Sequence, residues 1–165
     1  MTASRDDLTA QVRAVLDAAG IEHEDGTRPG EVIAALPGDH KLRTAVSLLV
    51  GDHSLSASAF VIRRPDENAD RVHAWLLRRN ARLQGVAYAI DRDGDVFVVG
   101  RLPVAAVTSD AVDALLGAVL DASDSAFDTL LAMGFLTSMR KEWAWRVSRG
   151  ESTRNLDAFR HLLED

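Results

Sequence analysis

Histidines and carboxylates are the residues of this chain that would have to carry metal or acid–base chemistry. No two histidines stand in an HxH pair or in the HExxH spacing of a helical zinc site. Cysteine is absent, which excludes disulfides, thiolate catalysis and cysteine metal sites. The run Asp91–Asp95 resembles part of a calcium loop, but Leu102 stands where the distal bidentate glutamate would fall. We therefore expect no metal and no other cofactor.

Motifs for nucleophilic catalysis and for phosphate binding are missing as well. No serine lies in a GxSxG elbow, and the chain has neither a GxxxxGK nor a GxGxxG loop. Its carboxylates stand at helix starts and turns, where capping accounts for them. We expect a protein that is not an enzyme and assign no catalytic residue.

Arginines near neighbouring strand and helix ends make the strongest case for binding chemistry. They are Arg63, Arg64, Arg78, Arg79, Arg82 and Arg101. Because a guanidinium group donates in a planar fork that suits carboxylate and phosphate, this cluster could line an anion site. The competing interpretation is a solvated surface. Some of these arginines complement a helix dipole, and only two of the 19 basic residues are lysines, a bias typical of actinobacterial codon usage.

Two further features could contact a ligand or a partner. Asn80 stands at a helix end, where it could cap the last turn, bond a strand carbonyl or contact a ligand. Trp143 and Trp145 flank Ala144 and precede Arg146, and aromatic residues beside arginine are favoured in protein interfaces. The alternative is that both tryptophans fill the core of a monomer.

Length and charge set broad limits. The 165 residues fit one domain, which we place at 1–165, and the net charge of −6 argues against nucleic acid as a partner. No window approaches the ~18–20 apolar residues of a membrane span, and the first residues do not read as a signal peptide. We expect a cytoplasmic protein that contacts no membrane.

Hydrophobic periodicity predicts the elements. Helices are expected at 4–19, at 66–83 and from 109 to 133 with a break or kink at 121–125, and the tail from 135 to 165 is expected to be helical. Strands are expected at 32–36, 42–50, 55–62, 86–90 and 96–102, whereas 21–30 reads as a loop. Short links between the strands predict an antiparallel sheet. Asp91–Gly94 predicts a tight hairpin turn with glycine in the left-handed region.

One side of the expected sheet is flat and weakly polar. Its side chains are Arg43, Ala45, Ser47, Ser54, Ser56 and Ser58. Small polar side chains of this kind make a sheet face that can tolerate water.

Several short motifs carry a family resemblance. They are Arg63-Arg64-Pro65, Arg79-Asn80-Ala81, Asp93-Gly94-Asp95, Gly100-Arg101-Leu102-Pro103, Leu116-Gly117, Phe127, Gly134-Phe135 and Trp143-Ala144-Trp145-Arg146. With them, the chain after about Val32 resembles the YbjN-like family of sensory transduction regulators. The resemblance implies the fold of type III secretion chaperones, in the order α-β-β-β-α-β-β-α. The periodicity gives the same order with an extra C-terminal helix. The resemblance implies no catalytic residue.

We therefore predict an α+β domain with an antiparallel sheet backed by helices. Its expected function is non-enzymatic binding of an unknown protein partner, chaperone-like or regulatory, through a strand edge or a hydrophobic helix face, by a homodimer. The alternative is a domain that senses a small ligand or anion through the arginine cluster. The candidate contact residues are Arg63, Arg64, Arg79, Asn80, Arg82, Arg101, Trp143, Trp145 and Arg146.

Overall fold

The structure is a computed structural model that describes residues 4–164. In this range six strands form one antiparallel sheet in the order β1-β2-β3-β4-β6-β5. The strands are β1 His23–Asp25, β2 Glu31–Pro37, β3 Arg43–Val50, β4 Ser54–Ile62, β5 Val86–Ile90 and β6 Val96–Pro103. The helices are α1 Arg5–Ala18, α2 Ala69–Asn80, α3 Ser109–Gly134, α4 Leu136–Arg149 and α5 Arg160–Leu163, with 3-10 turns η1 Val104–Ala106 and η2 Arg154–Phe159. The predicted α+β class and antiparallel sheet are confirmed.

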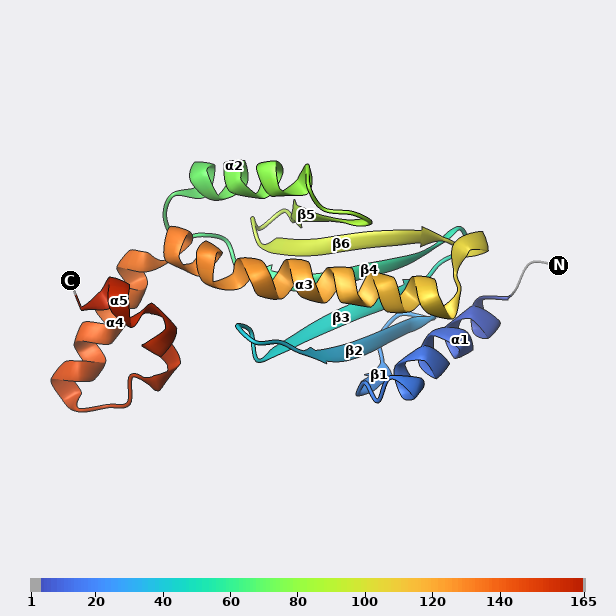
Figure 1. Cartoon of the computed structure of the whole chain (residues 1–165), viewed down its shortest axis with the longest axis horizontal. Coiled ribbons are helices and arrows are strands. Elements are labelled where there is room, and N and C mark those ends of the chain that lie inside the picture. The colour runs from blue at the N-terminus through green and yellow to red at the C-terminus, as the bar shows by residue number, and fades with distance from the viewer. Residues whose placement is uncertain (1–3, 165) are drawn as a thin grey trace.

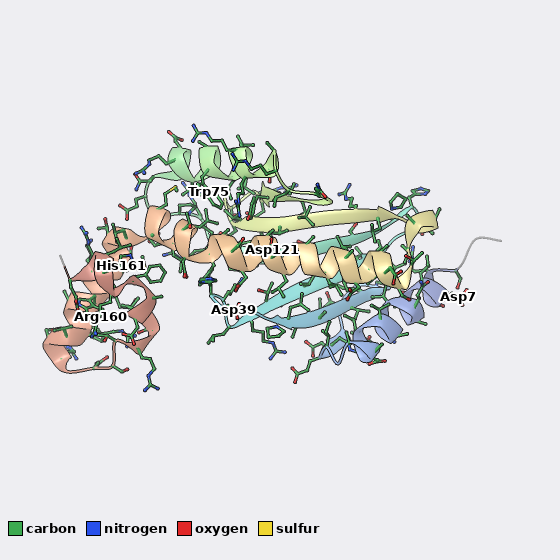
Figure 2. All side chains as sticks on the ribbon, in the orientation of Figure 1. Asp7, Asp39, Trp75, Asp121, Arg160 and His161 are labelled. Atoms are coloured by element: carbon green, nitrogen blue, oxygen red, sulfur yellow. The ribbon has the colours of Figure 1, made fainter. Side chains whose placement is uncertain are left out.

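The helices α1, α2 and α3 pack on one side of the sheet, and α3 runs along its length (Figure 1). The segment from α4 to α5 lies beyond the end of the sheet. Figure 2 shows this separation, with Asp7 of α1 at one end of the molecule and Arg160 and His161 at the other.

The core lies between the sheet and these helices because alternate strand residues point to the same side. Strand residues on the helix side are almost completely buried, and they pack against an equally buried helical set. The strand residues include Val32, Ala34, Val46, Leu48, Leu55, Ala57, Val96 and Val98, and the helical ones include Val12, Leu16, Val112, Leu116 and Val119. The Tyr88 hydroxyl donates to the Ala122 carbonyl at 2.6 Å, which ties β5 to α3 across this core.

Local signals placed α1 correctly. The Ser4 hydroxyl accepts from the Asp7 backbone N–H, and the Asp7 carboxylate accepts from the Ser4 N–H, so the predicted capping box is present.

The expected loop at 21–30 contains a short strand, β1, which pairs with β2 from His23↔Ala34 to Asp25↔Val32. Its three residues are polar or charged, so hydrophobic alternation gave no signal for it. A short charged strand is suited to the edge of a sheet because it discourages further pairing.

The expected break at 121–125 is wrong, because α3 is continuous for 26 residues. Ala122 and Ser123 are buried in the helix, and Asp124 makes tertiary contacts instead of ending it. The Asp124 carboxylate accepts three backbone N–H groups of the β2–β3 turn, from Asp39 at 3.1 Å, His40 at 3.0 Å and Lys41 at 2.8 Å.

Two other boundaries also move. The helix expected at 66–83 is α2, which begins at Ala69 after Asn68 in a left-handed conformation with φ 54°. Asp66 and Glu67 are therefore outside the helix, where they bind the C-terminal segment. The tail does not form one helix, because α4 ends at Gly150 with φ 67° and the chain returns through η2 and α5.

The hairpin turn predicted at Asp91–Gly94 is confirmed, since Gly94 has φ 87°. A Cβ there would lie 3.1 Å from Cγ of Arg64. Gly94→Ala should therefore lower the free energy of unfolding by about 1 kcal/mol, measured by urea denaturation. The control is Gly117→Ala in α3, where an added Cβ would have nothing within 4 Å. This substitution should raise the free energy of unfolding by roughly 0.5–1 kcal/mol. Equal effects of the two substitutions would contradict the strain argument.

Candidate functional site

No element within residues 4–164 covers the second side of the sheet, which we call the open sheet face. Register places its side chains in rows that cross five strands. One row is Ile33, Ser47, Ser58, Val99 and Ala87, and a second contains Ala35, Ala45, Phe60, Phe97 and Ala89. Nearly all of these side chains are small or apolar and remain at least partly exposed.

The open sheet face carries an aromatic pair on two interior strands, where Phe60 near the end of β4 lies against Phe97 on β6. The two rings meet edge to face with centroids 5.6 Å apart, and 42 % of Phe60 is exposed. An exposed aromatic pair beside rows of alanine, serine and valine can pack against an extended apolar chain. Such a continuous apolar surface marks an interaction site more often than scattered exposed residues do.

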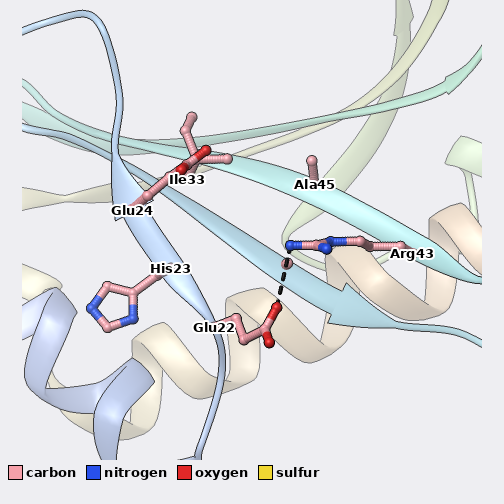
Figure 3. Close-up of a pocket in the computed structure, with 7 residues that line it drawn as sticks. Glu22, His23, Glu24, Ile33, Arg43 and Ala45 are labelled. Atoms are coloured by element: carbon pink, nitrogen blue, oxygen red, sulfur yellow. Dashed lines mark hydrogen bonds and ion pairs between the residues drawn. The ribbon is translucent and has the colours of Figure 1, made fainter.

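Charged side chains mark the borders of this face. A shallow pocket of about 420 Å³ lies at its β1 side, where Glu22 and Arg43 form an ion pair at 3.3 Å (Figure 3). Glu31 lies in the next row and is buried, and its pKa is lowered to about 2 by hydrogen bonds from Arg28 and Ser47. Arg101 stands exposed at the opposite side, on β6.

A second apolar surface is the α2–β5 groove, lined by His73, Leu76, Leu77, Asn80, Tyr88, Ala89 and Ile90, with a volume of about 380 Å³. Leu77 is 70 % exposed and Ile90 is 50 % exposed. The Asn80 side chain accepts from the Tyr88 N–H at 2.7 Å and donates to the Tyr88 carbonyl at 3.1 Å. Asn80 thus pairs with the outer edge of β5 as a neighbouring strand would, so side chains dominate what this groove offers to a partner.

A third apolar surface, the C-terminal groove, lies between β4, the end of α3 and the C-terminal segment, with a volume of about 410 Å³. Its apolar side chains include Phe60, Phe127, Leu131, Phe135, Met139 and Phe159. Phe60 belongs both to this groove and to the open sheet face, so the two surfaces are continuous.

The arginines of the sequence cluster do not meet at one place. Arg101 pairs with Ser56 on β4, and Arg63 follows Ser56 by seven positions, which is roughly 23 Å along a strand. Arg63 binds Asp66 in a two-point ion pair at 2.6 and 2.9 Å and lies 4.5 Å from the centroid of the Phe135 ring. Arg64 donates its backbone N–H to Asp95 at 2.7 Å.

The other members of that cluster belong to α2 and the turn after it. Arg79 is partly buried, with its guanidinium carbon 5.7 Å from the centroid of the Trp75 ring, and its Nε has no partner among the described residues. Burial raises the pKa of Tyr88. The charge and hydrogen bonding of Arg79 act against this shift. Arg78 and Arg82 are exposed.

The two tail tryptophans differ in their surroundings. Trp143 is half-buried against the core, with the Arg160 guanidinium carbon 5.7 Å from its ring centroid. Trp145 is 48 % exposed and lies beneath Arg149 at 5.0 Å. Arg146 binds Glu142 at 2.8 Å and the Ser152 carbonyl at 3.0 Å, and so holds the end of α4.

Sequence reasoning missed the residues that make the three surfaces apolar. Phe97 and Val99 alternate with buried residues of β6, so the side of the sheet they occupy was readable from the pattern. Leu77 follows the buried Leu76 and falls outside the helical stripe. Nothing in the sequence indicated that Phe60 and Phe159, which lie far apart in the chain, would line one groove.

From residue 4 to residue 164, no three histidine, aspartate or glutamate side chains gather as a metal site requires. No helix in that range combines the length and apolar character needed to cross a bilayer.

Comparison with known proteins identifies relatives. Residues 9–132 match the YbjN family, described as "Putative bacterial sensory transduction regulator". The chain is 45 % identical over 166 aligned positions to Uncharacterized protein Rv0487 of Mycobacterium tuberculosis, and the match covers 98 % of this chain and 91 % of that protein.

Three solved structures share the fold at low sequence identity. The ExsC-ExsE complex matches with a TM-score of 0.56 and 19 % identity, over 76 % of this chain and 95 % of that one. YbjN from E. coli matches with a TM-score of 0.55 and 20 % identity, over 80 % and 92 %. The Yersinia pestis type III secretion chaperone SycH, in complex with a fragment of YscM2, matches with a TM-score of 0.50 and 17 % identity, over 70 % and 96 %.

The junction between α2 and the C-terminal segment leads to a prediction about pH. Hydrogen bonds from Arg63 and Ser138 lower the pKa of Asp66 from 3.8 to about 2. The folded state therefore keeps this carboxylate charged at lower pH than the unfolded chain does. Its contribution to stability is complete above the unfolded pKa and is lost as the pH falls toward 2.

Asp66→Asn should accordingly lower the melting temperature at pH 6, and the difference from the parent protein should shrink as the pH approaches 2. Thermal unfolding followed by circular dichroism at several pH values measures this difference. The control is Asp113→Asn, an exposed acid on α3, which should change the melting temperature at pH 6 only slightly. If the difference in melting temperature between Asp66→Asn and the parent protein stays constant down to pH 2, the pairing of Asp66 with Arg63 and Ser138 is refuted.

Proposed function

The chain belongs to the YbjN family, and from this premise we propose that it is a non-enzymatic protein-binding module, chaperone-like or regulatory. In this proposal an extended apolar segment of a partner protein lies on the open sheet face. The observation that carries it is the uncovered side of a sheet whose exposed rows hold alanine, serine, valine and a phenylalanine pair.

Burial energetics support this use of the face. Each strand of the sheet adds about 4.8 Å of width, so five strands offer a surface roughly 20 Å across. Removing apolar surface from water is favourable by about 25 cal/mol per Å², and only what remains after the entropy costs of association appears as affinity. The small side chains keep the surface flat, so that a bound chain could lie close to the sheet.

Structural relatives support the same class of function. Two of the solved neighbours are complexes, one of ExsC with ExsE and one of the chaperone SycH with a fragment of YscM2. Those proteins bind protein partners, and we carry this property to the present chain as part of the proposal. The anion-sensing alternative has less support, because Arg63 and Arg146 are paired with carboxylates and Arg101 lies far from Arg63.

We also propose that the chain forms a homodimer through the α2–β5 groove. Leu77 and Ile90 are among the most exposed large apolar side chains of the described residues, and both lie in this groove. A twofold axis beside β5 would pack Leu77 and Ile90 of one protomer against the same two residues of its partner, as an isologous interface requires. Because Asn80 occupies the edge of β5, this contact would rely on side chains rather than on a continued sheet.

The binding proposal is tested with peptides selected from a displayed random library and measured by fluorescence anisotropy. Ala45→Glu places a charge in the middle of the open sheet face and should abolish binding. Its matched control is Ala114→Glu, at an exposed position of α3 on the opposite side of the sheet, which should bind as the parent does. Selection of no peptide, or equal binding by both variants, would refute the proposed function.

The dimer is tested by sedimentation equilibrium. The parent protein should sediment at twice its chain mass of 17.9 kDa, and Leu77→Asp should sediment as a monomer with unchanged helicity. Leu42→Asp is the control, since Leu42 is 89 % exposed but lies in the β2–β3 turn, away from the groove. A parent protein that stays monomeric at high micromolar concentration rules out the dimer.

A further inference from the structure

Lys41 is a cation that lies beside an apolar surface and takes part in none of the ion pairs found among the described residues. Its ammonium donates to the carbonyl of Phe60, and to the carbonyl of Val61 at 3.4 Å. No aspartate or glutamate forms an ion pair with it within residues 4–164. An ammonium has three N–H donors, so at least one is not used by these carbonyls.

The position of this ammonium connects it to the C-terminal groove. Nζ lies 5.2 Å from the centroid of the Phe60 ring and 5.8 Å from that of Phe127, and both rings line the groove. Burial lowers the pKa of Lys41, which means that its surroundings disfavour the charge. An anion placed beside Nζ would relieve this penalty.

The groove itself is suited to a large apolar group. Phe135, Met139 and Phe159 are almost fully buried around it, whereas Phe60 remains exposed at the side shared with the open sheet face. Its volume of about 410 Å³ is in the range of sites that bury compact apolar groups. Seven of the thirteen residues that line it come after residue 132, beyond the part that matches the family.

These observations deepen the proposed function and rest on it. We propose that the C-terminal groove anchors a bulky apolar side chain of the partner segment, and that Lys41 binds an acidic residue close to that side chain. The continuity through Phe60 lets one extended segment cross the open sheet face and enter the groove. The partner is thus a protein segment with an aspartate or glutamate near a large aliphatic or aromatic residue.

The first test asks whether charge pairs across the interface. Peptides selected on the full chain should share an acidic residue near a bulky apolar one. Changing that acid to its amide should weaken binding of the peptide to the parent protein roughly ten- to a hundredfold. The same change should have little effect on binding of the peptide to the Lys41→Gln variant. The control is Lys141→Gln, an exposed lysine on α4, which should retain the full sensitivity.

The second test fills the groove without touching its buried wall. Asn155 is exposed and lines the groove, so Asn155→Trp should block the anchor and weaken binding at least tenfold. Arg154→Trp adds the same side chain one position away, at an exposed residue that does not line the groove, and should bind normally. Circular dichroism checks that both variants fold.

The outcomes separate the anchor from the function on which it rests. One outcome is that peptides bind the parent protein, lose binding to the Ala45→Glu variant, and bind the Lys41→Gln and Asn155→Trp variants as they bind the parent. This outcome would overturn the anchor and leave the proposed function standing. Failure to select any peptide would overturn both. If Asn155→Trp instead changes the sedimentation of the protein alone, the groove holds a second copy and the anchor proposal is wrong.

Discussion

The helix α3 is longer than the sheet that it covers, and this difference in length determines where the C-terminal segment and the C-terminal groove lie. Its 26 residues extend about 39 Å, whereas β4, with nine residues, extends about 30 Å. The first part of α3 buries its apolar stripe on β3, β4 and β6. The remainder passes beyond the sheet and carries α4 with it (Figure 1). The C-terminal groove is the space left between that overhang and the end of β4.

Polar contacts fix the overhang in one orientation. The Gly134 carbonyl accepts the backbone N–H groups of Asp66 at 3.0 Å and Glu67 at 3.1 Å, and the Glu67 carboxylate accepts from Thr137 at 2.7 Å. A Cβ on Gly134 would lie 3.0 Å from the Pro65 ring, so the two segments meet closely there. Backbone hydrogen bonds of this kind contribute about 1 kcal/mol each, and together with the Glu67 contact they give the groove a defined shape.

Local chemistry made the fold readable, whereas the binding surfaces depend on contacts between distant residues. The Ser4–Asp7 capping box and the Gly94 turn are each complete within a few residues, and both were predicted correctly. The run Asp121–Ser125 was misread as a break because Asp124 serves a turn more than 80 positions away. The arginines adjoin in sequence but separate in space, since Arg63 and Arg101 stand near opposite ends of paired strands. Hydrophobic periodicity in the sequence does not indicate how far apart these two arginines lie.

A sheet with one uncovered side must avoid pairing with other chains indiscriminately, and this protein restricts that risk at its edges. The outer strand β1 is short and charged, and Asn80 occupies the backbone of Tyr88 on β5. With both edges restricted, the proposed partner segment would bind on the face and not extend the sheet. Across most of the face, alanine and serine would offer little energy per residue, so in this proposal the affinity concentrates where Phe60 and Phe97 meet. Phe60 also lines the C-terminal groove and lies beside Lys41. Selectivity among apolar segments would therefore arise at this end of the sheet, where a large side chain and an acid can be recognised together.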